Sequence, residues 1–327
     1  MPVTKFTNLD FDQIKEQIRS YLRANSNFTD FDFEGSNMSI LIDILAYNTY
    51  ISAFNSNMVV NESFLDSATL RENVVSLARN IGYVPRSRKS AQAIVNFDFK
   101  FNGDSNTTTL KKGLVAVGAK NGTSFTFSIP EDLVVNSPID TGSSITVNPP
   151  RTAQFRNITI YQGILLRKYF TVNDSLDQRF ILDNSFIDTD SLRIFVRKSG
   201  SSSGLEYSKI DNITGVNDKS NIYLIQEIKD EKYELIFGDG LFGKKLDNGD
   251  VIDVSYIITD GKEGNDGKFF SFSGDVVNDA GSPLSASTTP IISTIQTAKG
   301  GGDIEDIDSI KYIAPRVYSS QYRAVTA

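Results

Sequence analysis

A glycine-rich run, GDGLFG, is the motif whose spacing could form a phosphate-binding loop. Gly238, Gly240 and Gly243 match the pattern G-x-G-x-x-G and follow a stretch with strand periodicity. A dinucleotide site also needs a helix that begins at these glycines, so that its N-terminus faces the pyrophosphate. Residues 244–250, KKLDNGD, predict instead a second turn before another strand. We therefore expect a glycine-shaped structural turn that includes Asp239, and no cofactor.

The residue types that most nucleophilic and metal chemistry requires are missing. The chain contains no histidine and no cysteine, so Ser-His-Asp and Cys-His arrangements, zinc fingers and disulfides cannot be built within it. Its 40 acidic residues could supply a pair of glycosidase carboxylates. A pair of carboxylates is expected by chance among this many acidic residues, so its presence does not indicate a glycosidase. The sequence therefore predicts no enzyme, no catalytic residue, no metal site and no small-molecule substrate.

Phenylalanines and carboxylates alternate in the run DFDFE at 30–34. A calcium loop would need a longer series of oxygen ligands, with a central glycine and a terminal glutamate, which this run lacks. We expect an extended segment in which Phe31 and Phe33 dock while the carboxylates stay in water.

Charge and hydropathy argue against two further kinds of partner. The net charge is −7 and there is no dense basic run, which argues against nonspecific binding of nucleic acid. No stretch approaches the ~20 apolar residues that cross a bilayer, so we expect no membrane insertion. The class of the protein must therefore be inferred from the pattern of its apolar residues.

The longest apolar helical pattern begins at Met38. Apolar residues recur there at spacings of three, four and seven, and they cover more than half of a helix circumference. Ser36 or Asn37 can cap the N-terminus, and the Asn-rich run at 55–61 weakens the far end. One short neighbouring helix could not cover this surface. The surplus must be buried by the rest of the chain or by another chain.

Two shorter helices flank this one. An amphipathic helix is expected at 9–24 and another at 69–82, where Thr69 and Glu72 fit a capping box and Gly82 ends the helix. With the long helix at 37–58, they form the expected bundle region.

Asp43 is a carboxylate within the apolar pattern of the long helix. If it is buried, it needs a partner. The candidates are Arg19 and Arg23 of the first helix, or a residue of a neighbouring subunit.

From about residue 91 the apolar period changes from 3.6 to 2. Val95, Phe97 and Phe99 alternate with polar residues, and short strands then follow one another to about residue 256, separated by Gly, Asn, Asp and Ser clusters. Strands at this spacing, without helical periods between them, predict an antiparallel sandwich or barrel. The pattern leaves open whether there is one β unit or two small ones.

The last part of the chain changes composition again. Residues 271–302 are rich in Ser, Thr, Gly and Pro and predict an irregular connector, which could end in a strand. The triple glycine at 300–302 predicts a flexible joint. Residues 303–313 follow a helical pattern, and Pro315 is expected to end that helix.

Together these patterns predict an α+β fold, with an N-terminal helical bundle region, a mainly antiparallel β region and a short C-terminal helical arm. The expected domains are a helical assembly domain at 1–90, an all-β domain at 91–270, the connector at 271–302 and a final segment at 303–327.

Three separated runs of the chain resemble known families. The first run resembles the N-terminal region of the baseplate wedge subunits of T-even-like contractile-tail phages, and the two later runs resemble the wider baseplate J-like family. The first comprises DFDFEGSNMSILIDILAYNTY, NESFLDSATLRENVV and GYVPRSRKSA. The second is IFGDGLFGKKLDNGDVIDVSYIITDGKEGN at 236–265, and the third is GGGDIEDIDSIKYIAPRVYSSQYRAVTA at 300–327. The runs occur in the order found in the family and extend over most of the chain.

The resemblance implies a structural protein of the virion tail baseplate, assembled in the host cytoplasm. It implies three partners: a second copy of the chain, another baseplate wedge protein and the sheath-initiator protein. Helices of these proteins would bundle, and six wedges would close a ring around the tail tube. It also implies that residues 303–327 begin either a further J-like domain or a ring-closing arm. Whether the chain is split, truncated or naturally short relative to the family stays open.

The expected assembly interface consists of apolar residues from the three helices and from the segment before the long helix. These are Ile14, Ile18, Phe31, Phe33, Met38, Leu41, Leu45, Phe54, Leu70 and Val74. The alternative function is a β-rich tail adhesin that binds a host-surface glycan. The strands suit an adhesin, but the absence of tryptophan and the helical N-terminal part argue against it.

Overall fold

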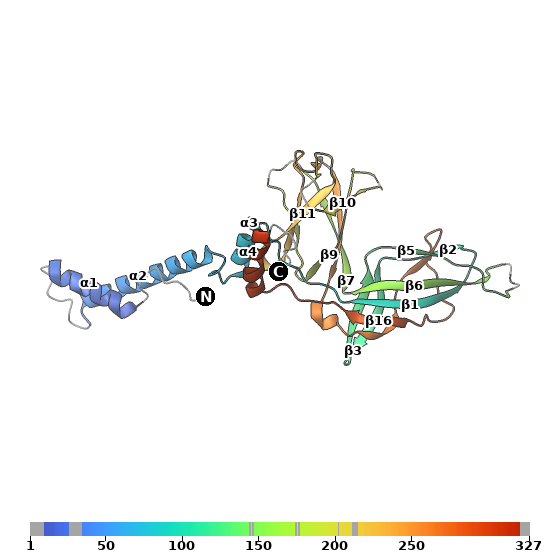
Figure 1. The fold of residues 1–327 in the computed structure, drawn as a ribbon, viewed down its shortest axis with the longest axis horizontal. Helices are drawn as coiled ribbons and strands as arrows, with labels where there is room; N and C mark the ends of the chain where they lie inside the picture. The colour runs from blue at the N-terminus through green and yellow to red at the C-terminus, as the bar shows by residue number, and fades with distance from the viewer. Residues whose placement is uncertain are drawn as a thin grey trace. The chain divides into compact units, whose positions relative to one another are not determined.

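The computed structural model describes residues 10–25, 35–143, 145, 147–173, 175, 177–201, 203–210 and 215–320. Phe31 and Phe33 lie outside the described residues. The chain divides into two compact units, a helical unit of residues 1–84 with 306–327 and a β unit of residues 85–305. Helices come first, mainly antiparallel strands follow, and a short helix ends the described chain (Figure 1). The α+β prediction is therefore confirmed.

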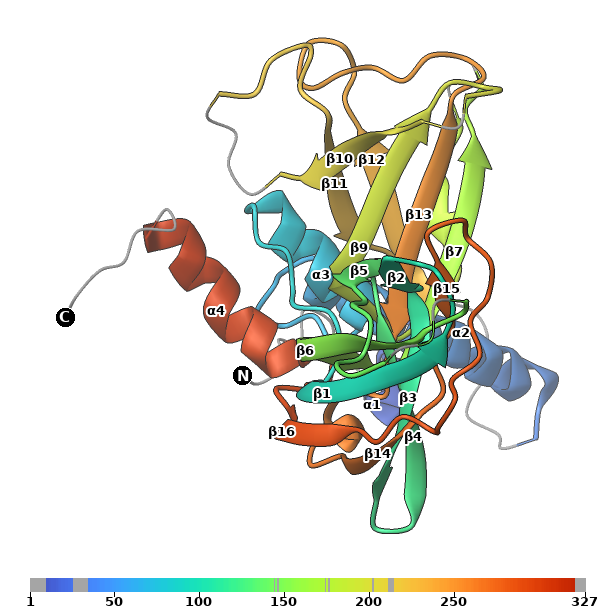
Figure 2. The same ribbon diagram turned by 90° about the vertical axis from the view of Figure 1, so that its right-hand side faces the viewer.

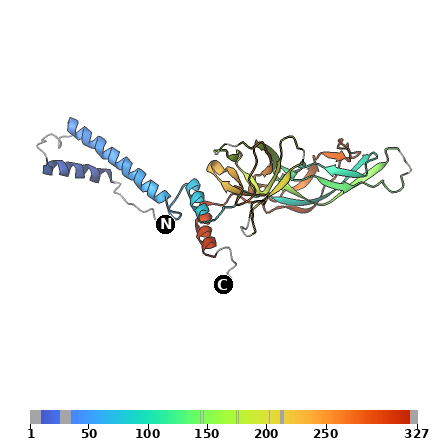
Figure 3. The ribbon, with the colours of Figure 1, turned by 90° about the horizontal axis from the view of Figure 1, so that it is seen from above.

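The first two helices form a hairpin. In Figure 3, α1 (Phe11–Asn25) lies beside α2 (Asn37–Glu62). Ser36 caps α2, because its Oγ accepts a hydrogen bond from the backbone N–H of Ser39 at 3.0 Å. Ile42 and Ala46 of α2 are buried. They therefore anchor one face of this long helix.

An ion pair joins the two helices of this hairpin. The Nζ of Lys15 in α1 lies 2.5 Å from Oδ1 of Asp43 in α2. The partner of Asp43 therefore comes from the first helix, as expected, but it is neither Arg19 nor Arg23. Arg19 instead lies 3.4 Å from Glu16 in its own helix.

The cap of α3 (Arg71–Asn80) differs from the expected capping box. The N-cap residue is Leu70, which offers no side-chain oxygen. Glu62, at the end of α2, accepts hydrogen bonds from the backbone N–H of Thr69 at 2.7 Å and from Nδ2 of Asn73 at 2.8 Å. The prediction of a Thr69–Glu72 box was wrong, because the chain folds back and the hydroxyl and backbone N–H of Thr69 both donate to Glu62.

The fourth helix, α4 (Ile307–Ser320), packs against α3. Figures 1 and 3 show the two helices side by side. Their shared core contains Ala68, Val74, Val75, Ala78, Ile310 and Ala314. Pro315 lies inside α4, so the prediction that it ends the helix was wrong. Proline removes one intrahelical hydrogen bond, and here the burial of Ala314 in the shared core keeps the helix continuous.

The β unit begins with a six-stranded sheet in the order β14-β3-β4-β6-β1-β16. Its strands are β1 (Gln92–Asn102), β3 (Gly113–Lys120), β4 (Thr123–Ile129), β6 (Pro150–Gln162), β14 (Lys268–Phe272) and β16 (Ser293–Lys299). The two outer strands meet, because Ser271 and Ile291 form an antiparallel bridge and Ala298 donates to the carbonyl of Gly267 at 3.0 Å. The sheet therefore curves into a barrel around one core.

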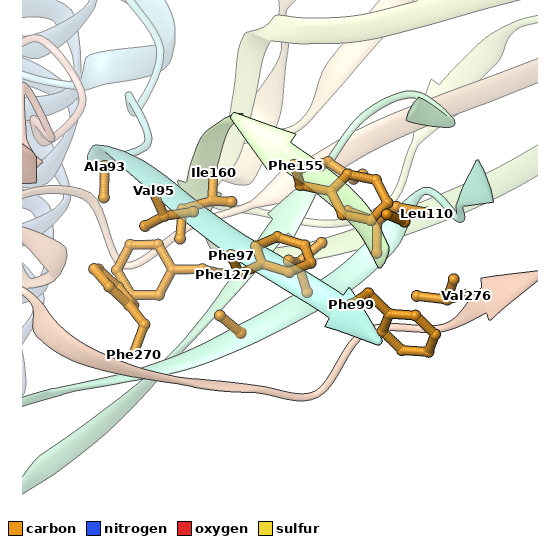
Figure 4. Packing of buried hydrophobic residues seen from close by; sticks show 14 of the residues in the cluster. Ala93, Val95, Phe97, Phe99, Leu110, Phe127, Phe155, Ile160, Phe270 and Val276 are labelled. Carbon is orange, nitrogen blue, oxygen red and sulfur yellow. The ribbon is translucent and has the colours of Figure 1, made fainter. Parts of the chain in front are cut away.

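Alternation in β1 supplies most of that core. Ala93, Val95, Phe97, Phe99 and Phe101 are all buried on one face of the strand. Figure 4 shows several of them with Phe155 of β6 and Phe127 of β4, and the rings of Phe97 and Phe155 stack with centroids 4.7 Å apart. The period of two in the sequence therefore identified the core strand correctly.

A second sheet has seven strands, in the order β7-β13-β9-β10-β11-β12-β8. They are β7 (Ile164–Thr171), β8 (Phe180–Leu182), β9 (Ile187–Arg197), β10 (Leu205–Lys209), β11 (Ile222–Glu227), β12 (Tyr233–Phe237) and β13 (Val251–Ile258). Figure 2 shows β9 and β13 side by side. This sheet has its own hydrophobic core, which includes Leu182, Ile194, Leu235, Ile252 and Tyr256. The single β unit thus contains two cores.

A small third sheet joins β2 (Thr107–Leu110), β5 (Leu133–Asn136) and β15 (Val276–Asn278). Two short 3-10 turns lie at Lys229–Glu231 and Gly261–Gly264. Since β15 and β16 both fall within 271–302, the segment expected to be an irregular connector contributes strands to two sheets.

The triple glycine is clamped. The backbone of Gly302 exchanges hydrogen bonds with that of Lys89, at 2.9 and 3.0 Å. Gly301 donates to Oδ1 of Asn265, and a Cβ added to Gly301 would lie 2.4 Å from the carbonyl oxygen of Gly261. The expectation of a flexible joint was wrong, because here glycine permits a close approach of two backbones.

Candidate assembly surface

The exposed part of α2 carries a continuous apolar stripe. Its members lie four, three, four, three and four residues apart, which is the spacing of a coiled-coil seam. They are Ile40, Ile44, Tyr47, Ile51, Phe54 and Met58, and each is between 36% and 61% exposed. Leu41 and Leu45, each 53% exposed, widen the stripe near the start of the helix. We call these eight residues the α2 seam.

The α2 seam has almost no charge around it. Between Asn37 and Asn61, Asp43 is the sole charged residue, and it is paired with Lys15. A helix exposed to water usually carries charged side chains on its outer face. An apolar face of this length, on a helix of 26 residues, is typical of a surface that another protein covers.

The residues expected at the interface fall into three groups. Leu41, Leu45, Phe54 and Leu70 are exposed, and Met38 is half-buried. Ile14 is buried and Ile18 half-buried within the chain itself, and Val74 is fully buried between α3 and α4. Phe31 and Phe33 lie outside the described residues.

Sequence reasoning did not include Ile40, Ile44, Tyr47, Ile51 and Met58 among the interface residues, although the alternating spacing of three and four was readable in the sequence. The sequence pattern alone does not predict which face of α2 is covered by α1, because several faces of this helix are apolar.

The Glu62 carboxylate fixes the connection between α2 and α3. Burial by itself would raise the pKa of Glu62, but the hydrogen bonds from Thr69, Asn73 and Leu70 outweigh it and lower the pKa from 4.5 to about 2. The carboxylate therefore stays charged at neutral and at mildly acidic pH. It occupies the N-terminus of α3, where a negative charge also interacts favourably with the helix dipole.

The glycine run forms a tight turn after β12. Oδ1 of Asp239 accepts hydrogen bonds from the backbone N–H groups of Leu241 at 2.9 Å and Phe242 at 2.8 Å. A Cβ added to Gly238 would lie 2.2 Å from the carbonyl carbon of Gly243, and Gly240 and Gly243 have positive φ. The described residues from 238 to 250 contain no helix, so the geometry that a dinucleotide site requires is absent there.

Two aspartates of the β unit line the same small groove. Asp188 and Asp190 line a groove of about 120 Å³, together with Lys89 and Arg193. Burial raises the pKa of Asp188, although its Oδ2 accepts from the backbone of Ser90 at 2.9 Å and its Oδ1 from that of Asp190 at 3.1 Å. Since substrate pockets typically measure ~300 Å³ or more, this groove suits a structural carboxylate better than a sugar site.

Within the part of the chain that the structure describes, no group of three or more acidic side chains is placed to hold a metal ion. Among these same residues, no helix combines the length and the apolarity that a membrane crossing requires.

Comparison with known proteins gives a family match for the helical part. Residues 10–83 match the model of the helical domain of baseplate wedge protein gp6-like proteins. The chain is 28% identical, over 98% of its length, to baseplate wedge protein gp6 of Enterobacteria phage T4, and it spans 49% of the length of that protein. The resemblance to baseplate wedge subunits is therefore confirmed.

A solved structure also aligns with most of the chain. It is the baseplate of the anti-feeding prophage (AFP), with 14% identity, coverage of 99% of this chain and 63% of that chain, and a TM-score of 0.28. A score this low does not establish a common fold.

Proposed function

We propose that this chain is a structural subunit of a contractile-tail baseplate wedge, and that the α2 seam is the surface through which it joins other wedge components. The single observation that carries the proposal is the exposed apolar stripe from Ile40 to Met58. The similarity to a phage baseplate wedge protein supports it, because that similarity runs through the helices that bear the seam.

The proposed partners are those that the resemblance implies: a second copy of the chain, another baseplate wedge protein and the sheath-initiator protein. Obligate contacts between such subunits typically bury ~2,000 Å² or more, and they resemble a domain core cut in half. A seam with coiled-coil spacing suits a helix of similar pattern, since the side chains of one helix insert between those of the other. The chain would act in the tail baseplate of the virion, after assembly in the host cytoplasm, and not as an enzyme.

The test is co-expression of the chain with the neighbouring tail genes, followed by measurement of the mass of any complex. The unsubstituted chain should form a complex of defined mass. Leu45→Asp should abolish that complex while the isolated chain keeps its circular dichroism spectrum, because Leu45 is exposed and the charge would be buried only on assembly.

Val74→Asp is the matched control. Val74 is fully buried between α3 and α4, so the same charge should unfold the helical unit itself, at a cost of several kcal/mol, about the effect of an unpaired buried charge. A chain that stays monomeric with every neighbour, or a Leu45→Asp variant that still assembles, would contradict the proposal. The adhesin alternative predicts a different result, a soluble trimer that binds host glycans without tail partners.

A further inference from the structure

Phe269 combines two features that are unfavourable in an isolated chain. Its backbone lies in the left-handed region, with φ +59°, and its side chain is 79% exposed. Bulky residues rarely adopt this conformation, whereas glycine and asparagine do so readily. Residues with strained backbone conformations cluster at functional sites of proteins.

The backbone distortion presents the ring to solvent. The pairing of β14 with β3 shifts register between Lys268 and Ser271. The next residue, Phe270, points into the barrel, where its ring meets that of Phe127 edge-on with centroids 4.8 Å apart (Figure 4). Phe269 therefore faces outward from a strand whose other face is anchored in the core.

Two exposed isoleucines lie on the neighbouring chain segment. Ile291, 83% exposed, pairs with Ser271, two residues from Phe269. Ile295 lies on the outer face of β16, four residues further along, and is 57% exposed. We call Phe269, Ile291 and Ile295 the Phe269 patch. It lies in the β unit and shares no residue with the α2 seam.

Two lysines lie near residues of the Phe269 patch. Lys268 lies with its Nζ 5.6 Å from the centre of the Phe269 ring. Lys100 lines a groove of about 480 Å³ together with Ile291, and in that groove Asp98 is neutralised by Arg156 at 2.5 Å. Among the described residues, neither Lys100 nor Lys268 forms an ion pair. A partner that supplied carboxylates would therefore complement both lysines.

We propose that the Phe269 patch is a second assembly surface, and that it binds a protein other than this chain through an apolar pocket edged by carboxylates. The exposed ring fills the pocket, and the two lysines face the acidic edge. Aromatic side chains held rigidly at the centre of a patch are typical energetic anchors of interfaces. The left-handed backbone conformation of Phe269 directs its ring outward from the strand.

The chain contains no cysteine, so Ser271→Cys, at an exposed position two residues from Phe269, creates a unique thiol for a maleimide-benzophenone crosslinker and keeps the Phe269 ring. The labelled chain is co-expressed or mixed with the neighbouring tail proteins and illuminated, and the product is mapped by mass spectrometry. We expect a crosslink to a different protein, at a segment that contains both apolar and acidic residues. A crosslink to a second copy of this chain, or quenching by solvent alone, would overturn the proposal.

Phe186 provides the matched control. It also has a left-handed backbone, with φ +67°, but it is only 47% exposed, and the guanidinium of Arg88 lies over its ring, 4.1 Å from the centroid. Phe269→Asn should leave Tm unchanged or higher, because asparagine tolerates this backbone, and should weaken binding of the tail partner by about tenfold or more. Phe186→Asn should lower Tm and leave binding unchanged. If Phe269→Asn lowers Tm as Phe186→Asn does, the ring has an internal role and the proposal fails.

The outcomes separate this proposal from the proposed role of α2. If Leu45→Asp abolishes the complex while Phe269→Asn binds as tightly as the unsubstituted chain, the α2 seam is supported and the Phe269 patch is refuted. If Leu45→Asp assembles normally and Phe269→Asn does not, the reverse holds. Binding of the unsubstituted chain to anionic lipid vesicles, lost in Phe269→Asn, would also refute a protein partner.

Discussion

Glu62 and Thr69 share two hydrogen bonds across the connection between α2 and α3. Oε1 of Glu62 accepts one from the backbone N–H of Thr69 at 2.7 Å and one from its hydroxyl at 2.6 Å. Ser67 reinforces the connection, because its Oγ donates to the carbonyl oxygen of Asn61 at 2.6 Å. The last residue of the seam-bearing helix therefore also holds the residues that lead into the next helix, and the two helices are joined through side chains as well as through the backbone.

Glu62→Gln should destabilise the helical unit and change its response to acid. The pKa of Glu62 is about 2 in the folded chain, below its ordinary value of 4.5, so its contribution to stability is complete above pH 4.5 and is lost as the pH falls through about 2. Near neutral pH the variant should lose about 1 kcal/mol of unfolding free energy, the usual effect of a helix N-cap. Urea unfolding followed by circular dichroism at several pH values measures both quantities.

Asp66→Asn is the control for this effect. Asp66 is exposed and lies on the same connection, but it makes none of the hydrogen bonds that Glu62 makes. Its replacement should leave both the stability and the acid response unchanged. Equal losses in the two variants would mean that general charge, and not the cap, stabilises the connection.

The helix α2 shows what could be predicted from the sequence. Its period, its Ser36 cap and its surplus of apolar surface were all readable, because they depend on residues close together in the chain. The same holds for the core face of β1, where alternation alone identified Phe97 and Phe99.

Glu62 and the triple glycine show why the rest could not be predicted. Glu62 reaches Asn73 across 11 positions, and Gly301 meets Asn265 across 36. Both contacts depend on the tertiary fold, which brings distant residues together and which no local sequence pattern encodes. Glycine is also ambiguous by itself, since it serves either flexibility or close approach. Val74 is a further example. The sequence correctly placed it on the apolar stripe of a helix, but the helix that covers it, α4, lies more than 200 residues away in the chain.

Gly301→Ala should destabilise the β unit. The new methyl group would lie 2.4 Å from the carbonyl oxygen of Gly261 and 3.0 Å from Cβ of Ala91, so the backbone would have to shift. We expect a loss of about 1–3 kcal/mol, as for overpacked cores. Differential scanning calorimetry measures it. Gly302→Ala serves as the control, because a Cβ there meets nothing within 4 Å, and it should be close to neutral. A neutral Gly301→Ala variant would restore the idea of a flexible joint.

Asp239→Ala should loosen the glycine turn and leave assembly intact. The backbone N–H groups of Phe242 and Leu241 lower the pKa of Asp239, which shows that the turn stabilises the charged form. Without the carboxylate, the N–H groups of Leu241 and Phe242 can form hydrogen bonds only with water, so Tm should fall slightly. The mass of the complex with tail proteins should stay the same. Loss of the complex in a variant that is still folded would place an interface at this turn.

The paired backbones of Lys89 and Gly302 bear on how this protein could change over time. Arg86 and Glu305 continue the pairing, since the N–H of Glu305 donates to the carbonyl oxygen of Arg86 at 3.0 Å. The segment between Arg86 and Glu305, which contains all the described strands, therefore begins and ends at neighbouring points. A segment with adjoining ends can be gained, exchanged or deleted as a cassette, because a few residues suffice to reconnect what flanks it. Relatives with a larger, smaller or altogether different insert, yet the same helices around it, are the expected evolutionary outcome.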